Sequence, residues 1–568
     1  MSALRLSLAQ INPTVGDIAG NVALMSAAAQ NAAVDGASMV IFPELSLTGY
    51  WPGDLLDEAE FLARVDAGLA ELAAASRATP GLCWVVGAPT RRAGPGKRLH
   101  NSLLVLRDGE VVLSYAKQLL PTYNVFDESR HFAPGPDVAR VLRVGGAQVG
   151  FLICEDGWND DGADYAVNPF RRLADAAPDL VVSINASPSN IGKREQRHAL
   201  FAAASRRHKL PLVYVNQIGG HDQLVYDGAS FAVTPEAGVV FEAPRFVEAQ
   251  VTLQWDGVAF RAGDGAPLPP VAAAGLPVME FYRRQIVLGL RDYARRCGFK
   301  QVVVGSSGGI DSALTLALAA EALGPENVVA VTLPSRFSSS GSVDDSVTLC
   351  ANLGIKLYTH PIKALVGQYE ADFVAAFGEP LHGLALENLQ ARVRGTVLMA
   401  WSNRYGHLLL TTGNKSEISV GYCTLYGDTN GGLGLIGDLY KTEVFELCRH
   451  LNAEAGRELI PTAIIDKEPS AELAPDQRDS DSLPPYPVLD TILKVLIEGE
   501  RLGAAERAAV QADYATLAAG PDGPALIARV RRLIARNEYK RRQAPPILRL
   551  RGRAFGSGRQ MPIAAKYD

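Results

Sequence analysis

Three residues with reactive side chains each stand at the end of an apolar segment in the first half of the chain. They are Glu44, Lys117 and Cys154, and the segments before them have the composition of buried strands. A cysteine thiolate attacks an amide carbonyl, a carboxylate carries the thiol proton to the leaving amine, and an ammonium stabilises the oxyanion. Because groups at the carboxyl ends of strands gather at one edge of a mostly parallel sheet, we expect these three to form one amide-hydrolysing site.

The sequence around these residues resembles the carbon–nitrogen hydrolases, or nitrilases. Pro-Glu-Leu surrounds Glu44, Lys-x-x-Leu-Pro begins at Lys117, and Ile-Cys-Glu-Asp-Gly-Trp surrounds Cys154. The resemblance covers residues 1 to about 260 and implies a four-layer α-β-β-α sandwich. As in the glutamine-hydrolysing members, it also implies that the substrate glutamine is bound by Tyr123, Glu128, Ser187 and Lys193.

A second chemical motif lies between a strand-like and a helix-like segment. Residues 301–304 form a short β-branched run, and residues 311–323 contain neither Pro nor Gly. Between them Ser307-Gly308-Gly309 lets backbone N–H groups approach an anion at the positive end of a helix. Neither the Walker motif nor the Gly-x-Gly-x-x-Gly fingerprint is present. We therefore predict that residues 305–312 form an anion site of a different type from these two.

This loop resembles that of the ATP pyrophosphatases, which bind the pyrophosphate of ATP and release AMP. The matching sequence is Ser-Gly-Gly-Ile-Asp-Ser at residues 307–312. Carboxylate oxygens are the ligands that Mg²⁺ prefers, so we expect Asp311 and Glu417 to hold the Mg²⁺ that accompanies ATP. The resemblance implies ATP binding by Gly305, Ser306, Ser307, Gly308, Gly309, Ile310, Asp311, Ser312 and Thr412.

From about residue 280 to 560 the chain resembles the NAD synthetase family. The motifs are Gly-Asn-Lys-Ser-Glu at 413–417, Gly-Asp-Leu-Tyr-Lys at 437–441 and Glu-Pro-Ser-Ala-Glu-Leu at 468–473. The resemblance implies a doubly wound parallel sheet that adenylylates nicotinic acid adenine dinucleotide on its carboxylate before ammonia attacks. Lys441 and Ser470 stand at the positions of the family's active-site lysine and hydroxyl residue, the latter usually threonine. The residues expected to contact the dinucleotide are Asn388, Arg392, Glu417 and Lys441.

Length and composition set the frame for both sites. A chain of 568 residues is too long for one core, and we predict domains at 1–262 and 278–568 joined by a Pro- and Gly-rich linker at 263–277. A net charge of −6 argues against a dedicated nucleic-acid binder, and we expect the basic residues from 529 to 553 to be mostly solvated, with a few reaching the dinucleotide. With no signal-like or membrane-length segment, we expect a cytoplasmic protein without a membrane partner.

Together the two halves predict an ammonia-transferring ligase for the final step of NAD biosynthesis. The first half would release ammonia from glutamine and the second would consume it, with release of glutamate, AMP and pyrophosphate. Three alternatives remain open: another adenylylated acceptor (xanthosine phosphate, aspartate or a tRNA base), an amidase whose second half only binds nucleotide, and a nucleotide-sensing module. The resemblance also implies a homo-oligomer, at least a dimer through the second domain.

Overall fold

The computed structural model describes residues 3–566 and divides the chain into two compact units. The first comprises Met1–Gly219 and Val225–Gly275, and the second comprises Gly220–Leu224 and Leu276–Asp568. Among the described residues, no helix combines the length and the apolar character needed to cross a bilayer.

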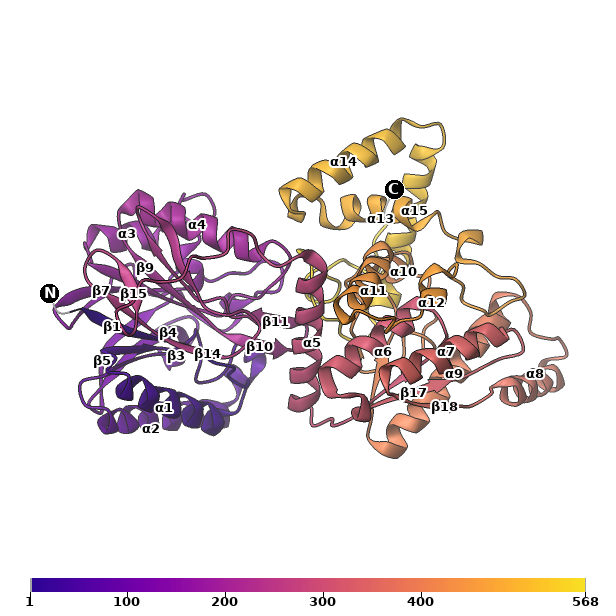
Figure 1. Cartoon of the computed structure of the whole chain (residues 1–568), viewed down its shortest axis with the longest axis horizontal. Helices are drawn as coiled ribbons and strands as arrows, with labels where there is room; N and C mark the ends of the chain where they lie inside the picture. Colours follow the sequence, from indigo (N-terminus) through magenta and orange to yellow (C-terminus); the bar gives the residue numbers. More distant parts are fainter. Residues whose placement is uncertain (1–2, 567–568) are drawn as a thin grey trace. The chain divides into compact units, whose positions relative to one another are not determined.

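The first unit contains two large β-sheets with helices outside them (Figure 1), and β10 (Ile218–His221) and β11 (Leu224–Asp227) form a separate two-stranded sheet. One sheet has the order β15-β14-β1-β2-β3-β4-β5. Its strands are β1 (Leu4–Gln10), β2 (Met39–Ile41), β3 (Cys83–Arg91), β4 (Leu99–Arg107), β5 (Glu110–Ala116), β14 (Ala249–Trp255) and β15 (Phe260–Ala262). The other has the order β13-β12-β9-β8-β7-β6. Its strands are β6 (Val141–Val144), β7 (Ala147–Ile153), β8 (Leu180–Asn185), β9 (Leu212–Asn216), β12 (Phe231–Thr234) and β13 (Gly238–Glu242).

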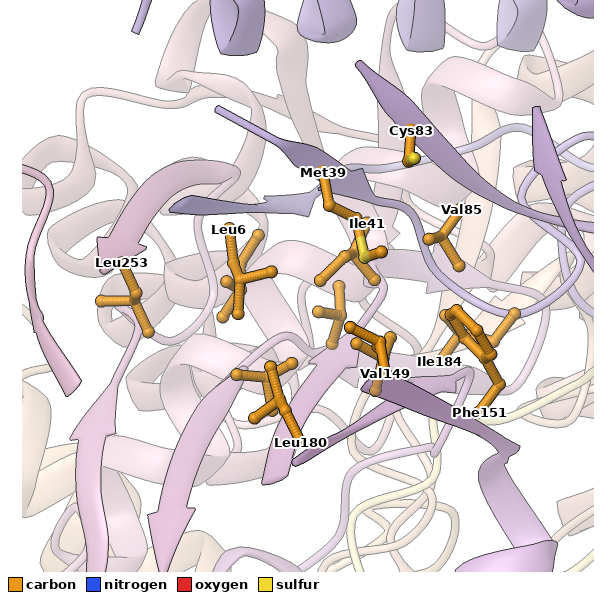
Figure 2. Packing of buried hydrophobic residues seen from close by; sticks show 14 of the residues in the cluster. Leu6, Met39, Ile41, Cys83, Val85, Val149, Phe151, Leu180, Ile184 and Leu253 are labelled. Atoms are coloured by element: carbon orange, nitrogen blue, oxygen red, sulfur yellow. The ribbon is translucent and has the colours of Figure 1, made fainter. Parts of the chain in front are cut away.

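Alternating apolar side chains of the two sheets form the core of this unit. Ile41 and Val85 of the first sheet belong to the same buried cluster as Val149 and Phe151 of the second (Figure 2). Burying each such side chain contributes roughly 1.5–3 kcal/mol. Helices α1 (Ile18–Val34) and α2 (Ala59–Ala75) cover the first sheet, and α3 (Pro169–Asp175) and α4 (Lys193–His208) cover the second (Figure 1). The predicted four-layer α-β-β-α order is thereby confirmed.

The three strands that precede the reactive residues do not share one sheet, contrary to the expectation from the sequence. Strands β2 and β5 run in the same direction in the first sheet, whereas β7 belongs to the second. The period-2 pattern of a strand shows which side chains are buried but not which sheet the strand joins. The reactive groups therefore come together between two packed sheets rather than at one edge.

The second unit is built on a five-stranded sheet of order β18-β17-β16-β19-β20, in which every neighbouring pair is parallel. The strands are β16 (Val302–Gly305), β17 (Val328–Thr332), β18 (Lys356–Thr359), β19 (Leu408–Thr411) and β20 (Leu433–Gly434). From β16 the chain adds β17 and β18 on one side of that strand, and it then crosses to add β19 and β20 on the other side. The loops after β16 and β19 therefore diverge and open a crevice at the carboxyl ends of the strands. The doubly wound parallel sheet is confirmed.

Helices of the second unit pack against the sheet and against one another. The apolar side chains of Val303, Val329 and Leu409 meet Leu389 of α9 on one face of the sheet. The helices are α5 (Val278–Arg296), α6 (Ile310–Leu323), α7 (Ser340–Leu353), α8 (Lys363–Phe377), α9 (Leu384–Tyr405), α10 (Lys415–Val420), α11 (Lys441–Ala455), α12 (Thr462–Asp466), α13 (Tyr486–Leu493), α14 (Ala504–Ala519), α15 (Gly523–Arg536) and α16 (Glu538–Arg541).

Candidate active sites

A lysine and two glutamates are buried in contact in the first unit. Lys117 Nζ lies 2.7 Å from Glu44 Oε1 and 2.7 Å from Glu128 Oε1, and each side chain is at most 1% exposed. Burial alone would lower the pKa of Lys117, but the charges of Glu128 and Glu44 outweigh it and raise that pKa well above its usual value. Lys117 is therefore an ammonium held between two carboxyl groups. The structure thus brings Glu128, which the sequence predicts to bind glutamine, beside Glu44 and Lys117.

Cys154 follows β7 directly and begins the 3-10 turn Cys154–Gly157. Its φ of 43° lies in the left-handed region, which residues other than glycine rarely adopt. Burial raises the pKa of the Cys154 thiol well above its usual value, and the charge of Glu44 adds to this while that of Lys117 opposes it. The thiol is therefore protonated at rest and needs a base to become nucleophilic.

Asp156 holds the segment that follows Lys117 and was not singled out from the sequence. Its Oδ1 accepts the backbone N–H groups of Gln118 at 3.0 Å and Leu119 at 2.9 Å, and its Oδ2 accepts the hydroxyl of Tyr115 at 2.6 Å. The residue is visible in the Ile-Cys-Glu-Asp-Gly-Trp motif, but the sequence does not show what it binds. Asp156 thereby connects the turn Cys154–Gly157 to the segment that follows Lys117.

Asn101, near the start of β4, is a second residue that the sequence did not indicate. Its Nδ2 donates to Glu44 Oε1 at 2.8 Å and to Glu128 Oε2 at 3.3 Å, and its backbone carbonyl accepts the N–H of Lys117 at 2.8 Å. No local pattern marks an asparagine within a strand as part of a site. Its partners lie 16 to 57 positions away in the chain, so only the fold brings them together.

Tyr123, predicted to bind glutamine, faces a carboxylate beside the cysteine. The hydroxyl of Tyr123 donates to both oxygens of Glu155 at 3.1 Å, and that of Tyr165 donates to Oε1 at 2.9 Å. Burial raises the pKa of Glu155, while the nearby charge of Lys117 opposes that shift. The structure therefore adds Glu155 and Tyr165 to the residues around Cys154.

Ser187 and Lys193, the other two predicted glutamine-binding residues, follow β8. The buried Ser187 accepts a hydrogen bond on Oγ from Arg197 Nε at 3.2 Å. Lys193 Nζ lies over the indole ring of Trp158, 3.7 Å from its centre, and its charge acts on Glu155. Lys193 is thus near the cysteine turn, whereas Ser187 is tied to an arginine that was not predicted.

In the second unit the predicted anion loop connects β16 to the first turn of α6. Gly308 has a φ of +74°, and a Cβ there would lie 2.3 Å from the carbonyl oxygen of Ser342, so only glycine fits. The hydroxyl of Ser312 donates to the carbonyl of Gly309 at 2.9 Å and fixes the loop against the helix. The first N–H groups of a helix have no acceptor within the helix, so this helix start provides the expected environment for phosphate.

This loop borders a cavity of about 280 Å³. The ends of β17 and β19 and the segment from Ile464 to Leu473 complete its walls. Gly308 is the one predicted loop residue outside the lining. The predicted residues that line the cavity are Gly305, Ser306, Ser307, Gly309, Ile310, Asp311, Ser312, Thr412, Glu417, Lys441 and Ser470.

One ammonium joins the two carboxylates that the sequence assigns to Mg²⁺. Lys441 Nζ lies 2.5 Å from Asp311 Oδ2 and 3.0 Å from Glu417 Oε1. Asn414 donates to Asp311 Oδ1 at 2.8 Å and caps α10 by accepting the N–H of Glu417 at 3.0 Å. Burial raises the pKa of Glu417 to about 8. Two carboxylates beside a phosphate loop are a suitable donor set for Mg²⁺.

Asn388 and Arg392, predicted to contact the dinucleotide, do not line this cavity. Asn388 Oδ1 accepts the hydroxyl of Thr424 at 2.7 Å, and Arg392 Nε donates to the carbonyl of Leu425 at 3.2 Å. Both therefore hold the loop from 421 to 430, of which Tyr422, Gly427, Asp428 and Asn430 do line the cavity. Their contact with the dinucleotide stays a prediction.

One unit has a thiol beside a base and an ammonium, and the other has a loop suited to bind phosphate. This combination is that of an amidotransferase that uses ATP to activate an acceptor. The carbon-nitrogen hydrolase family model matches residues 5–259, and the NAD synthase model matches residues 282–544. The chain belongs to the glutamine-dependent NAD(+) synthetases, which are ligases.

Relatives of this family match over nearly the whole chain. The chain is 42% identical to the glutamine-dependent NAD(+) synthetase of Synechocystis sp., covering 99% of both chains, and 42% identical to that of Rhodobacter capsulatus, covering 99% of this chain and 98% of the relative. The structure of the enzyme from Acinetobacter baumannii in complex with adenosine diphosphate is 36% identical, has a TM-score of 0.76, and is matched over 99% of this chain and 98% of that one.

Proposed function

We propose that this chain converts nicotinic acid adenine dinucleotide to NAD⁺ with ATP and with ammonia released from glutamine. The observation that carries the proposal is that the chain combines a buried Glu44–Lys117 pair beside Cys154 with a cavity in which Lys441 faces the phosphate loop. Glutamate, AMP and pyrophosphate are the other products.

In the first unit Glu44 takes the proton of the Cys154 thiol, and the thiolate attacks the side-chain amide carbon of glutamine. The ammonium of Lys117 stabilises the oxyanion that forms. Glu44 then returns the proton to the leaving nitrogen, ammonia departs, and water hydrolyses the thioester to glutamate. The raised pKa of the buried thiol supports the need for this base.

The amino-acid end of glutamine meets opposite charges near the cysteine. Glu155, held by the hydroxyls of Tyr123 and Tyr165, is a partner for the α-ammonium group. Lys193, whose charge acts on Glu155, is a partner for the α-carboxylate. An uncharged amide lacking both groups would bind weakly, which gives the site its preference for glutamine.

In the second unit the loop at residues 305–312 binds the phosphates of ATP. The carboxylate of the dinucleotide attacks the α-phosphorus, pyrophosphate leaves, and ammonia then displaces AMP from the acyl adenylate. Lys441 neutralises the negative charge that develops on the leaving pyrophosphate. Asp311 and Glu417 would hold Mg²⁺, which supplies further charge neutralisation to the phosphates.

Comparing Cys154→Ala with the wild type tests the assignment. NAD⁺ formation from nicotinic acid adenine dinucleotide and Mg-ATP is measured with glutamine and, separately, with an ammonium salt. The variant should lose the glutamine reaction and keep the ammonia reaction. A Cys83→Ala variant, changed at a buried core cysteine of the same unit, should keep both. Absence of NAD⁺ from wild type with either nitrogen source would refute the acceptor, and normal glutamine use by Cys154→Ala would refute the nucleophile.

We further propose that the chain assembles at least as a dimer through the second unit. Helix α8 supports this, because Tyr369 and Phe377 on it are 53% and 70% exposed. Light scattering of the full chain should give at least twice the monomer mass, and Tyr369→Ser with Phe377→Ser should lower it. A monomeric wild type at micromolar concentration would refute assembly.

A further inference from the structure

The hydrogen bonds around Glu44 leave its carboxylate with one open position. Oε1 accepts from Lys117 Nζ at 2.7 Å and from Asn101 Nδ2 at 2.8 Å. Among residues 3–566, the one donor to Oε2 is the backbone N–H of Ala186, at 3.0 Å. A carboxylate has two lone-pair positions on each oxygen, so Oε1 is saturated and Oε2 has one position left.

We propose that Asn101 is a positioning residue that, together with Lys117, occupies Oε1 of Glu44 and so directs proton transfer with Cys154 to Oε2. The S–H bond of Cys154 breaks as the Oε2–H bond forms, and the same proton later passes to the leaving nitrogen of glutamine. In this role Asn101 acts through Glu44 and not on the thiol or the amide directly.

The orientation of the Asn101 amide is fixed by its neighbours. Its Nδ2 lies within hydrogen-bond distance of both Glu44 and Glu128, and a flipped amide would place its oxygen against two carboxyl groups. Its Oδ1, on a fully buried side chain, has no hydrogen-bond partner among the described residues. Because an unpaired buried oxygen is costly, this asparagine is not placed for stability alone. What the asparagine provides at this position is a pair of hydrogen bonds from its Nδ2 to the two carboxyl groups.

Asn101 and Lys117 together close a ring with the two glutamates. Lys117 donates to Glu44 Oε1 and Glu128 Oε1, and Asn101 donates to Glu44 Oε1 and Glu128 Oε2. Other groups that act on this ring are Tyr50, which donates to Glu128 at 2.8 Å, and the Cys154 thiol. The carboxyl groups of Glu155 and Asp156 also interact with the charge of Lys117. Asn101 thus supplies a neutral donor to the carboxylate of Glu44 without adding a second ion pair.

Asn101→Ala in the full-length chain tests this role, with Ser102→Ala as the matched control. Ser102 is the next residue of β4, is also buried, and bonds to Thr90 instead of to the glutamates. In Asn101→Ala, kcat/KM for glutamine should fall by about 10². The acidic limb of its pH profile should move up by about one pH unit, because the ionised carboxylates lose a donor. Ser102→Ala should change neither.

The second readout is alkylation of Cys154 by iodoacetamide, followed by peptide mass spectrometry between pH 6 and 9. The rate at Cys154 should fall about tenfold at pH 7 in Asn101→Ala, because thiolate formation depends on the oriented base. Asn101→Asp, which keeps the shape but adds a third carboxyl group, should lose at least as much. An unchanged acidic limb together with an unchanged alkylation rate would overturn the proposal.

The inference rests on the proposed glutamine hydrolysis but can fail separately from the rest of the function. Ammonia-dependent NAD⁺ formation should be unchanged in Asn101→Ala, which shows that the second unit is folded, and an unchanged Tm of the first unit shows the same for the unit that carries the substitution. If that variant does not fold, Asn101→Asp carries the same pH and alkylation tests. If wild type makes no NAD⁺ from either nitrogen source, the acceptor is refuted, while glutamate release and alkylation still decide the role of Asn101.

Discussion

The carboxylate of Asp156 accepts the backbone N–H of Gln118 at 3.0 Å. Gln118 follows Lys117 directly, and Asp156 lies two positions beyond Cys154, so one hydrogen bond ties the oxyanion-stabilising lysine to the nucleophile turn. The same carboxylate accepts the N–H of Leu119 and the hydroxyl of Tyr115. The relative position of ammonium and thiol therefore depends on a residue that takes no part in the chemistry.

Replacing Asp156 with asparagine should impair glutamine hydrolysis without affecting the second unit. Asparagine offers one acceptor oxygen, and its N–H₂ group would oppose either the N–H groups of Gln118 and Leu119 or that of Ile153, which Oδ2 of Asp156 accepts at 3.3 Å. Hydrogen bonds to a charged group are worth about 1.5–3 kcal/mol each, so the first unit should also unfold more easily. Glutamate release should fall about 10- to 100-fold, because small displacements of catalytic groups cost this much, while ammonia-dependent NAD⁺ formation stays at the wild-type rate. Unchanged glutamate release would show that the turn is held by other contacts.

Glu128→Gln should change the pH dependence of stability in a defined direction. Burial raises the pKa of Glu128 from 4.5 to about 7. Between these pH values the folded state keeps a proton that the unfolded state releases, so the free energy of unfolding falls as pH rises through this window. The raised pKa of Lys117 contributes stability that is constant here, because the lysine is protonated in both states. Glutamine cannot titrate, so the variant lacks the falling contribution.

Thermal unfolding of wild type and Glu128→Gln between pH 5 and 8 measures this effect. The Tm of the variant relative to wild type should rise with pH by on the order of 5 °C, whatever its value at pH 5. Glu110→Gln, at the exposed start of β5, should follow the wild-type curve. Parallel curves for Glu128→Gln and wild type would mean that Glu128 titrates normally.

Much of the first site could be predicted because its residues follow strands. The sequence pattern placed Glu44, Lys117 and Cys154 at the ends of strands, and the structure ends these strands at Ile41, Ala116 and Ile153. The pattern could not assign those strands to two sheets, since alternation reports burial and not pairing. Asn101 was missed for a related reason, because its contacts join segments 57 positions apart and leave no local signature.

In the second site, too, the local features could be predicted from the sequence and the long-range partners could not. The glycine loop was recognisable because its spacing serves a local purpose, the turn between a strand and a helix. Asn414 links Asp311 to the first turn of α10. It lies within a recognisable motif, but the motif does not show that its partner is 103 positions away. Spacing along the chain predicts local geometry well and long-range partners poorly.

Lys441→Met should abolish NAD⁺ synthesis from both nitrogen sources. The substitution removes the ammonium that bridges Asp311 and Glu417 and leaves two carboxylates facing each other near the phosphates. Loss of one such stabilising group typically costs 10²–10³ in kcat, and we expect a loss of about 10³ here. Glutamate release should persist, since its residues lie in the other unit. Lys363→Met, at the exposed start of α8, should behave as wild type, and a Lys441→Met variant that keeps ammonia-dependent activity would exclude a catalytic role.

The basic residues from 529 to 553 were predicted to be mostly solvated, but one of these arginines is buried among carboxylates. Arg551 is not solvated: it is 1% exposed and its guanidinium contacts Glu443 at 2.5 Å, Glu498 at 2.7 Å and Glu506 at 2.7 Å. The prediction was wrong there because composition counts charges but does not show their partners. These carboxylates come from α11, from the turn after α13 and from α14, so Arg551 joins three elements of the second unit.

Arg551→Met should therefore destabilise the second unit far more than an exposed arginine would. Removing one partner of a buried ionic cluster typically costs about 3–5 kcal/mol, because the remaining charges keep their desolvation cost without the attraction. Arg532→Met, on the exposed face of α15, should change the free energy of unfolding by less than about 0.5 kcal/mol. Calorimetry should show a lower Tm for the second unit of Arg551→Met, and brief heating should remove ammonia-dependent NAD⁺ formation before glutamate release. Equal loss of both activities would mean that the two units unfold together, and an unchanged Tm would mean that the carboxylates in this cluster are protonated or find other partners.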